Sequence, residues 1–331
     1  MAFPKRVIFC ECWARDGLQS VPVWVPTDRK LEMIERFVDA GFPKIEVTSF
    51  SHPKLLPQFR DAEEVLRRLP RTGRAADVSY VVLMPNERGF DRFERCVEEG
   101  YGAHEIILMI SASEEHNLRN FRMRHEEAFR AHERIMRRAH RLGVHVIGCA
   151  GTVYGCPIMG DVSFEAVAKI VRFYLDNGAR TIMLGDTTGM ANPVLVKERI
   201  GRLMDTFPGA QFIAHFHDTR GTGIANTVAA LETGVVYVDG SVGAIGGQPA
   251  TGAPKYHVGY TGNISSEDTV ALLHEMGIET GIDLDKLIEA GRRAEEILGM
   301  KLRSEVVRCG PVNHGPAPAE KGEGERLVLP E

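Results

Sequence analysis

The chain has 331 residues, of which 44% are hydrophobic and 26% are charged, and its formal net charge is -5. This composition indicates a soluble, enzyme-sized protein, and its slightly acidic balance lacks the basic surplus typical of general nucleic-acid binders. No run approaches the roughly 18 apolar residues of a membrane span. We therefore expect no nucleic-acid partner and no membrane role.

The six cysteines show no zinc-type C-x-x-C spacing, and the N-terminus lacks an apolar signal core. We expect a cytoplasmic protein without disulfides, with Cys10 and Cys12 in or near the core. The arginine-rich stretch from Arg119 to Arg141 is best explained as the solvated side of a helix. Binding of an anionic substrate is the alternative explanation.

Short β-branched and apolar runs alternate along the chain with segments whose apolar residues recur at helical spacing. The strand candidates are Val7–Cys12, Lys44–Ser49, Val78–Leu83, Glu105–Ile110, Val144–Ala150, Thr181–Gly185, Gln211–His217 and Val235–Ser241. The helical segments between them include Asp28–Ala40, Glu87–Glu99, Phe164–Asn177 and Pro193–Phe207. Eight strand-then-helix units in about 240 residues predict a (β/α)8 TIM barrel.

The alternative fold is a doubly wound open sheet. It would need a glycine-rich phosphate-binding turn directly after the first strand, where this chain has Cys12-Trp-Ala-Arg-Asp-Gly17. After the eighth strand the pattern changes to two helices, Thr269–Met276 and Leu284–Leu298, and then to a Gly-, Pro-, Lys- and Glu-rich tail. We predict a barrel domain over residues 1–265, C-terminal helices packed on it over 266–309, and a flexible tail over 310–331.

A histidine pair ends the seventh strand candidate. His215 and His217 are two residues apart, which places both imidazoles on one face of a strand and allows them to chelate one divalent cation. Functional groups of such barrels lie at the carboxyl ends of the strands, so other strand-end polar residues should share their rim. Asp16 follows the first strand and Asn263 follows the eighth. Together the four residues form a nitrogen and oxygen ligand set suited to Mg²⁺ or Mn²⁺.

Other strand-end polar residues should lie at the same rim: Arg15, Glu46 with Thr48–Ser49, and Asp186 with Thr187. Each candidate also has a plainer explanation, because a strand-end Asp or Asn is more often a cap or turn residue and a lone His can be a core group. Their coincidence at one rim favours the metal site.

Motifs spread in order along the chain resemble those of 3-hydroxy-3-methylglutaryl-CoA (HMG-CoA) lyases, a branch of a metal-dependent lyase and synthase group. They are Arg15-Asp-Gly-Leu-Gln19, Ile45-Glu-Val-Thr-Ser-Phe50, His52-Pro-Lys-Leu-Leu-Pro-Gln58, Met84-Pro-Asn86, Leu184-Gly-Asp-Thr187, His215-Phe-His-Asp-Thr219 and Gly246-Gly247. The resemblance extends from about residue 7 to residue 300.

The resemblance implies a TIM-barrel lyase with a divalent metal cofactor, an acyl-CoA substrate and a homo-oligomeric assembly. It implies the metal ligands Asp16, His215, His217 and Asn263. It also implies that Arg15 holds the oxygen that becomes an enolate, with supporting or acid–base roles for Gln19, Glu46 and Asp186. The reaction would be a retro-Claisen cleavage to acetyl-CoA and an oxo acid.

The chain departs from the lyase pattern after its glycine pair, where Gln248 stands in place of a catalytic cysteine and a longer stretch precedes Asn263. A glutamine cannot transfer a full proton near neutral pH. Tyr256, His257 or Tyr260 could supply the missing acid, and His257 is the best tuned to neutral pH. An equal alternative is a lid that only packs over substrate.

The altered loop favours a related 3-hydroxyacyl-CoA, such as citramalyl-CoA, over HMG-CoA itself. Two other functions stay open: a metal-dependent aldolase acting on a free acid without CoA, and a non-catalytic metal-binding barrel. Retention of Arg15, Glu46 and Asp186 beside the predicted ligands disfavours the second, because a structural metal site does not need them.

Overall fold

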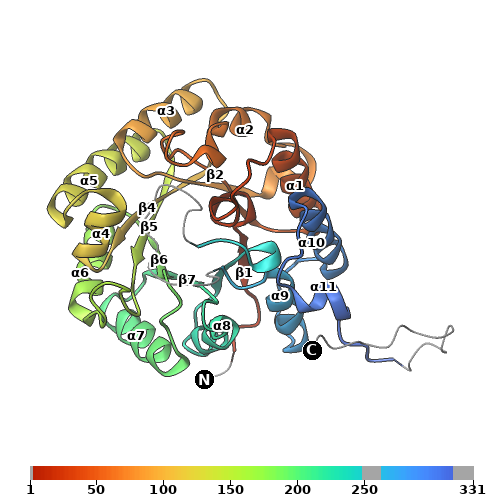
Figure 1. Ribbon diagram of the computed structural model, residues 1–331. Coiled ribbons are helices and arrows are strands. Elements are labelled where there is room, and N and C mark those ends of the chain that lie inside the picture. The colour runs from red at the N-terminus through yellow and green to blue at the C-terminus, as the bar shows by residue number, and fades with distance from the viewer. Residues whose placement is uncertain (1–2, 248–261, 316–331) are drawn as a thin grey trace.

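A closed barrel of parallel strands, ringed by helices, is formed by residues 3–247 and 262–315, which the computed structural model describes (Figure 1). The strands follow chain order around the barrel: β1 (Ile8–Glu11), β2 (Lys44–Ser49), β3 (Ser79–Leu83), β4 (Glu105–Ser111), β5 (His145–Gly151), β6 (Thr181–Asp186), β7 (Gln211–Phe216) and β8 (Tyr237–Gly240). Pairing of β1 with β8 closes the sheet, with Cys10 opposite Asp239. The predicted (β/α)8 TIM barrel is confirmed, and the open doubly wound sheet is excluded.

Helices cover the outside of the barrel. They are α1 (Thr27–Ala40), α2 (Ala62–Arg68), α3 (Glu87–Glu98), α4 (Glu114–Phe121), α5 (His125–Arg141), α6 (Phe164–Asp176), α7 (Pro193–Thr206), α8 (Gly223–Glu232), α9 (Ser266–Glu275), α10 (Leu284–Leu298) and α11 (Glu305–Cys309). Among these described residues, no helix has the length and apolarity needed to cross a bilayer.

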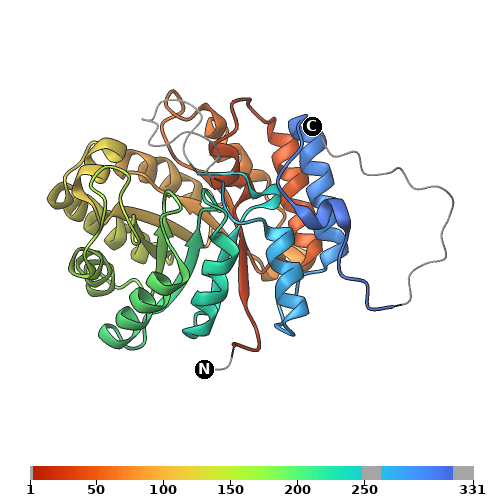
Figure 2. The same cartoon turned by 60° about the horizontal axis from the view of Figure 1, so that its bottom comes forward.

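The extra C-terminal helices expected from the sequence are present. Helix α9 follows β8, and Figure 2 shows α10 and α11 on the same side of the barrel as α1. Helix α1 ends at Gly41, whose φ of 99° and close approach to the Gly281 carbonyl both require glycine, because a Cβ there would lie 2.5 Å from that oxygen. The N–H of Asp283 also donates to the carbonyl of Ala40 at 2.8 Å. The C-terminal helices are thus attached to the first helix of the barrel.

Two hydrophobic layers hold the fold together. Inside the barrel, six side chains form a compact cluster: Val81, Ile107, Ile147, Cys149, Met183 and Ile213. A larger layer lies between the strands and the helices. Burying one large aliphatic side chain contributes roughly 1.5–3 kcal/mol, so these layers supply a rigid base beneath the strand ends.

The arginine-rich stretch forms two helices. Helix α4 ends at Arg122, which adopts the left-handed conformation with φ 56°, and α5 begins at His125. On α5 the Arg134 side chain is about half exposed and pairs with Glu87 of α3 at 2.7 Å. The expected solvated face is present, but on a second helix rather than on one continuous helix.

Candidate active site at the mouth of the barrel

The turn directly after β1 carries two of the predicted site residues. It is a single buried π-helical turn, η1 (Trp13–Gly17), and it contains Arg15 and Asp16. Gly17 lets this turn approach the chain after β8, because a Cβ there would lie 2.9 Å from the Ser241 hydroxyl oxygen. The segment after the first strand therefore lies against the segment after the last one.

Three potential ligand atoms meet beside this turn. His215 and His217 come from the end of β7, and their Nε2 atoms are 3.1 Å apart. Oδ2 of Asp16 lies 3.5 Å from Nε2 of His217, and the three side chains, all buried, place one ligand atom each within 4.8 Å of one another. Two facing imidazole nitrogens can share at most one proton, whereas a cation accepts both lone pairs.

Asn263 joins this group through a bridge to the backbone of His217. Its Nδ2 donates to Asp16 Oδ2 at 2.6 Å and to the Ile245 carbonyl at 3.0 Å. Within the described ranges, its buried Oδ1 and the Nδ1 of His217 lack hydrogen-bond partners. A buried polar atom without a partner costs about 1–3 kcal/mol, and a cation would offset that cost at the Asn263 oxygen. The donor set therefore fits a divalent cation.

Gly246 forms a cradle for these ligands. Its φ is 132°, and a Cβ at this position would lie 2.1 Å from Asn263 Nδ2 and 2.9 Å from Asp16 Oδ2. Only glycine fits, because any side chain would displace the amide or the carboxylate. The first glycine of the Gly246-Gly247 pair is therefore required by the close approach of the proposed ligands.

Arg15 lies between two carboxylates. Its Nε donates to Glu46 Oε2 on β2, and its Nη1 donates to Asp16 Oδ1 at 2.8 Å. Burial alone would raise the pKa of Asp16, but Arg15 and His217 hold it well below its usual range. Burial raises the pKa of Glu46 despite its contact with Arg15. Asp16 is therefore ionised, as a metal ligand must be.

The remaining predicted residues differ in placement. Gln19 Nε2 donates to Asp16 Oδ1 at 3.0 Å and to the Gly247 carbonyl at 2.5 Å, so it belongs to the group. The carboxylate of Asp186 faces its own turn, where it accepts from the N–H groups of Met190 and Ala191 at 2.8 and 3.2 Å. Burial raises the pKa of Asp186 to about 6 against these N–H groups and nearby His217, which lower it.

The loop residues Gln248, Tyr256, His257 and Tyr260 lie outside the described residues, as does the tail beyond residue 315. The acid predicted at His257 therefore stays a prediction. Cys156, which follows β5, is buried, and its thiol donates to Ser113 Oγ at 3.1 Å, so it takes part in packing.

Sequence reasoning missed Asp239 on β8. Its Oδ2 lies 3.2 Å from His215 Nδ1. Burial lowers the pKa of His215, but Asp239 together with Asp16 and Glu46 raises it above its usual value. A carboxylate on the outer nitrogen fixes the tautomer and leaves Nε2 to act as a ligand. The signal was available, because Tyr237, Asp239 and Ser241 alternate within the predicted strand and share its inward face.

Two further polar features at the mouth were also missed. Ser111 ends β4, and its Oγ lies 2.7 Å from Nδ1 of His116, whose pKa burial lowers to about 4. A Cβ at Gly151 would lie 3.4 Å from Ser111 Oγ and 3.3 Å from Thr187 Oγ1, so both hydroxyls face the mouth. Ile107 and Met109 point into the barrel, and Ser111 is the next residue of that alternation. The predicted strand ended at Ile110, one residue too early to include it.

Glu11 is the second feature, and it connects three segments. Its Oε1 accepts from the N–H groups of Trp13 and Val242, both at 2.9 Å, and its Oε2 accepts from the Ser266 hydroxyl at 2.6 Å. One buried carboxylate therefore joins η1, the segment after β8 and the first residue of α9.

The barrel and the polar group at its mouth define a TIM-barrel enzyme. The HMGL-like family model matches residues 6–293, and the chain belongs to this family. Hydroxymethylglutaryl-CoA lyase YngG of Bacillus subtilis is 38% identical over 304 residues, which cover 92% of this chain and 97% of that protein. The human mitochondrial hydroxymethylglutaryl-CoA lyase is 36% identical over 306 residues, covering 92% of this chain and 90% of that protein.

Solved structures agree with these relatives. An HMG-CoA lyase from Acinetobacter baumannii, in complex with coenzyme A and 3-methylmalate, superposes with a TM-score of 0.85 at 38% identity, covering 96% of this chain and all of that one, 100%. The Bacillus subtilis HMG-CoA lyase superposes with a TM-score of 0.86 at 36% identity over 93% of this chain and 99% of that one. Because the relatives include bacterial and mitochondrial proteins, the cytoplasmic location stays a prediction.

Proposed function

We propose that the chain is a divalent-cation-dependent lyase that cleaves a 3-hydroxyacyl-CoA into acetyl-CoA and an oxo acid. HMG-CoA and the related citramalyl-CoA are the candidate substrates. The observation that carries the proposal is the buried group of Asp16, His215, His217 and Asn263 beside Arg15, in a chain 38% identical over 92% of its length to a hydroxymethylglutaryl-CoA lyase.

The proposed ligands are the carboxylate of Asp16, the Nε2 atoms of His215 and His217, and the amide oxygen of Asn263. Their oxygen and imidazole donors suit Mg²⁺ or Mn²⁺. When bound, such a cation polarises substrate oxygens and stabilises negative charge that develops on them. Asp239 supports this group by holding His215 in the tautomer that leaves Nε2 free of a proton.

Arg15 acts on the thioester. Within the described residues, its Nε and Nη1 bond Glu46 and Asp16, which leaves Nη2 to donate to the substrate carbonyl oxygen. That oxygen becomes negative as the bond between C2 and C3 breaks and its electron pair forms the enolate of acetyl-CoA. A preorganised donor aimed at developing charge is worth about 10²- to 10³-fold in rate.

Asp186 accepts the proton of the substrate hydroxyl in this proposal. Its carboxyl has a pKa raised by burial to about 6, so it is mostly ionised at neutral pH and yet basic enough to take a proton. Loss of the hydroxyl proton forms the oxo group of the product, and the enolate takes a proton at C2 from an acid. His257 remains the predicted acid.

The proposal is tested by mass spectrometry of the products formed from HMG-CoA, citramalyl-CoA and the matching free acids. Wild-type protein is compared with Asp16→Asn and Arg15→Met, each with Mg²⁺, with Mn²⁺ and with EDTA. The matched control is Arg36→Met on α1, where the side chain is 41% exposed and pairs with Glu32 of the same helix.

Cation-dependent release of acetyl-CoA, lost in the two mouth variants and kept in Arg36→Met, is the expected result. Cleavage of free acids alone would replace the proposal by an aldolase without CoA. Cation binding without turnover of any thioester would refute the lyase and favour the alternative of a non-catalytic metal-binding barrel.

A further inference from the structure

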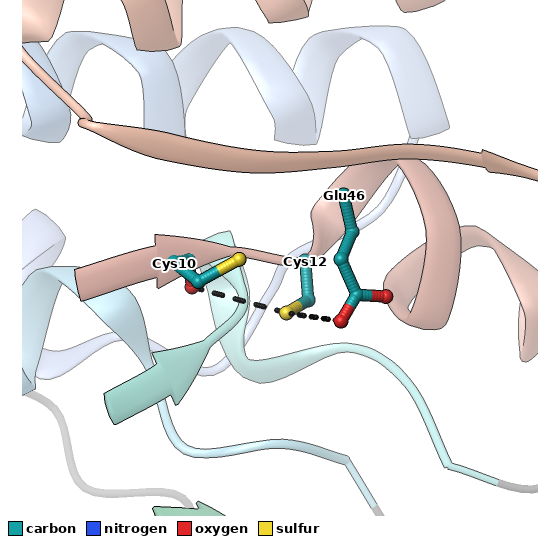
Figure 3. A group of neighbouring side chains, drawn as sticks. All are labelled: Cys10, Cys12 and Glu46. Carbon is teal, nitrogen blue, oxygen red and sulfur yellow. Dashed lines mark hydrogen bonds between the residues drawn. The ribbon is translucent and has the colours of Figure 1, made fainter. Parts of the chain in front are cut away.

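A second group of potential ligand atoms lies at the end of β1 and on β2, close to Arg15. Figure 3 shows the Cys12 sulfur between the Cys10 side chain and the Glu46 carboxylate. One ligand atom from each of the three side chains lies within 4.8 Å of the others, and all three are buried. Two thiols and a carboxylate in one buried space form a donor set unlike that of the histidine group.

The geometry follows from strand pairing. Cys10 lies on β1, and Cys12 directly follows the last residue of that strand, where its thiol turns back to the Cys10 carbonyl at 3.8 Å. Strand β2 pairs alongside, with Lys44 opposite Cys10 and Ile45 opposite Glu11. Glu46 is the next residue on β2. The Cys12 thiol donates to Glu46 Oε1 at 3.5 Å, whereas the other carboxylate oxygen accepts from Arg15.

We propose that Cys10, Cys12 and Glu46 form a second cation site that is selective for thiophilic divalent cations such as Zn²⁺ and Cd²⁺. Sulfur is a soft donor that favours these ions over Mg²⁺ and Mn²⁺, whereas Asp16 and Asn263 offer hard oxygen donors. The thiol site is therefore the selective one, because the imidazoles of His215 and His217 also accept Zn²⁺. On binding, both thiols transfer their protons to solvent and the thiolates bond the cation.

Burial supports this selectivity. Burial raises the pKa of Cys10 to about 12 and that of Cys12 well above its usual range, so both thiols keep their protons at neutral pH in the absence of a cation. Only an ion with strong affinity for thiolate can displace those protons. A hard cation does not gain enough from sulfur to do so, and it stays with the oxygen and imidazole ligands.

Occupation of this thiol site should also affect the cleavage reaction at the barrel mouth, and this consequence rests on the proposed function. Glu46 is shared, because the carboxylate that would bond the thiophilic cation also accepts from Arg15 Nε. Drawing Glu46 toward the sulfurs removes one of the two carboxylates that orient the guanidinium and leaves only its bond to Asp16. Zn²⁺ or Cd²⁺ is therefore expected to inhibit cleavage by Mg²⁺-loaded protein.

Binding is tested with reduced, cation-free full-length protein titrated with Cd²⁺ and followed by the ultraviolet charge-transfer absorption of cadmium thiolates. A His215→Ala/His217→Ala variant removes the first site, and a Cys10→Ala/Cys12→Ala variant removes the second. Cys96→Ala on α3 is the matched control, since its thiol is also buried but bonds the Arg92 carbonyl. Native mass spectrometry counts the bound ions, and circular dichroism verifies folding.

The absorption is expected in wild-type protein, in the histidine variant and in Cys96→Ala, and it should be lost in the double cysteine variant. Its persistence in the folded double cysteine variant, or its absence from folded wild-type protein, would overturn the proposal. If the double variant does not fold, Cys12→Ser takes its place, with at least a tenfold loss of Cd²⁺ affinity expected and an unchanged affinity counting against the site.

Inhibition is measured separately, as the rate with Mg²⁺ plus Zn²⁺ relative to each variant's own rate with Mg²⁺ alone. The ratio should fall further in wild-type protein than in Cys12→Ser, in which Zn²⁺ acts only at the histidine site, and equal ratios would count against the inhibition through Glu46. Cd²⁺ binding in a protein that cleaves no thioester would refute the proposed function and leave the thiol site standing. Thioester cleavage by a protein that shows no thiolate absorption would refute the thiol site and leave the proposed function standing.

Discussion

The carboxylate of Glu11 allows a quantitative test of how the mouth is held together. Replacing Glu11 by alanine leaves three buried donors without their acceptor: the N–H groups of Trp13 and Val242 and the hydroxyl of Ser266. Each unsatisfied buried donor costs about 1–3 kcal/mol, so the loss of the acceptor for three donors should lower the free energy of unfolding by about 3–9 kcal/mol in Glu11→Ala.

Glu11→Gln should cost much less. The amide keeps one oxygen as an acceptor for the two N–H groups, and the Ser266 hydroxyl can turn to accept from the new NH₂ group. The expected loss is about 1 kcal/mol near pH 6, the net value of one exchanged hydrogen bond.

The two variants also differ from wild type in pH dependence. Burial raises the pKa of Glu11 from 4.5 to about 8, although the donors of Ser266, Val242 and Trp13 lower it. The folded protein therefore holds a proton that the unfolded chain has lost, and this stabilisation is fully present below pH 4.5 and is lost as the pH rises through 8. Because Glu11→Gln does not titrate, its deficit should shrink by up to about 1.4 kcal/mol per pH unit above about pH 6, and the variant should become more stable than the wild type before pH 8.

Urea unfolding, followed by far-ultraviolet circular dichroism at these pH values, measures both effects. Glu35→Ala and Glu35→Gln on α1 are the controls, because Glu35 is exposed. The reasoning is refuted if Glu11→Ala costs no more than Glu35→Ala, or if the deficit of Glu11→Gln is constant with pH.

Three other results are expected. Asp239→Asn removes the carboxylate on His215 and should weaken Mn²⁺ affinity about 10- to 100-fold by calorimetry, so an unchanged affinity would contradict the tautomer argument. Gly246→Ala places a methyl group 2.1 Å from Asn263 Nδ2 and should abolish Mn²⁺ binding, whereas Gly209→Ala, also at positive φ but with no atom within 4 Å of its Cβ, should cost stability alone. Adding EDTA to Mn²⁺-loaded wild-type protein should lower its unfolding temperature, because a cation that binds only the folded state stabilises it; equal temperatures would show that no cation was held.

Periodicity was sufficient to predict the barrel, because the interior face of each strand repeats every second residue regardless of its neighbours. It failed where a tertiary contact overrides a local preference. Helix formers continue through the sequence around Arg122, yet the helix breaks there. Asn117 explains the break, because its side chain accepts from the Ser111 N–H and donates to the Met123 carbonyl. No sequence window contains the packing that fixes this arrangement.

The same limit applies to the site. The site residues at strand ends were predicted correctly to lie near one another, because the carboxyl ends of the strands meet at one rim of a barrel whatever the loop conformations are. Glu11 was missed because its partners Val242 and Ser266 are 231 and 255 residues away along the chain. Asp186 was found, but the direction of its carboxylate depends on the N–H groups of the following turn, which no strand pattern specifies.

Closure of the barrel by pairing of β1 with β8 means that the sheet cannot close until β8 has been synthesised. The register pairs Ile8 with Tyr237, so the first strand leaves the ribosome long before its partner exists. At about 5–20 residues per second, the delay is on the order of 10 to 50 seconds. During that interval β1 keeps one edge without its partner strand, and α1 lacks the contact that α10 later makes with it. Because an unpaired edge can pair with another chain, we expect misassembly of the nascent protein to occur in this interval rather than after β8 has been made.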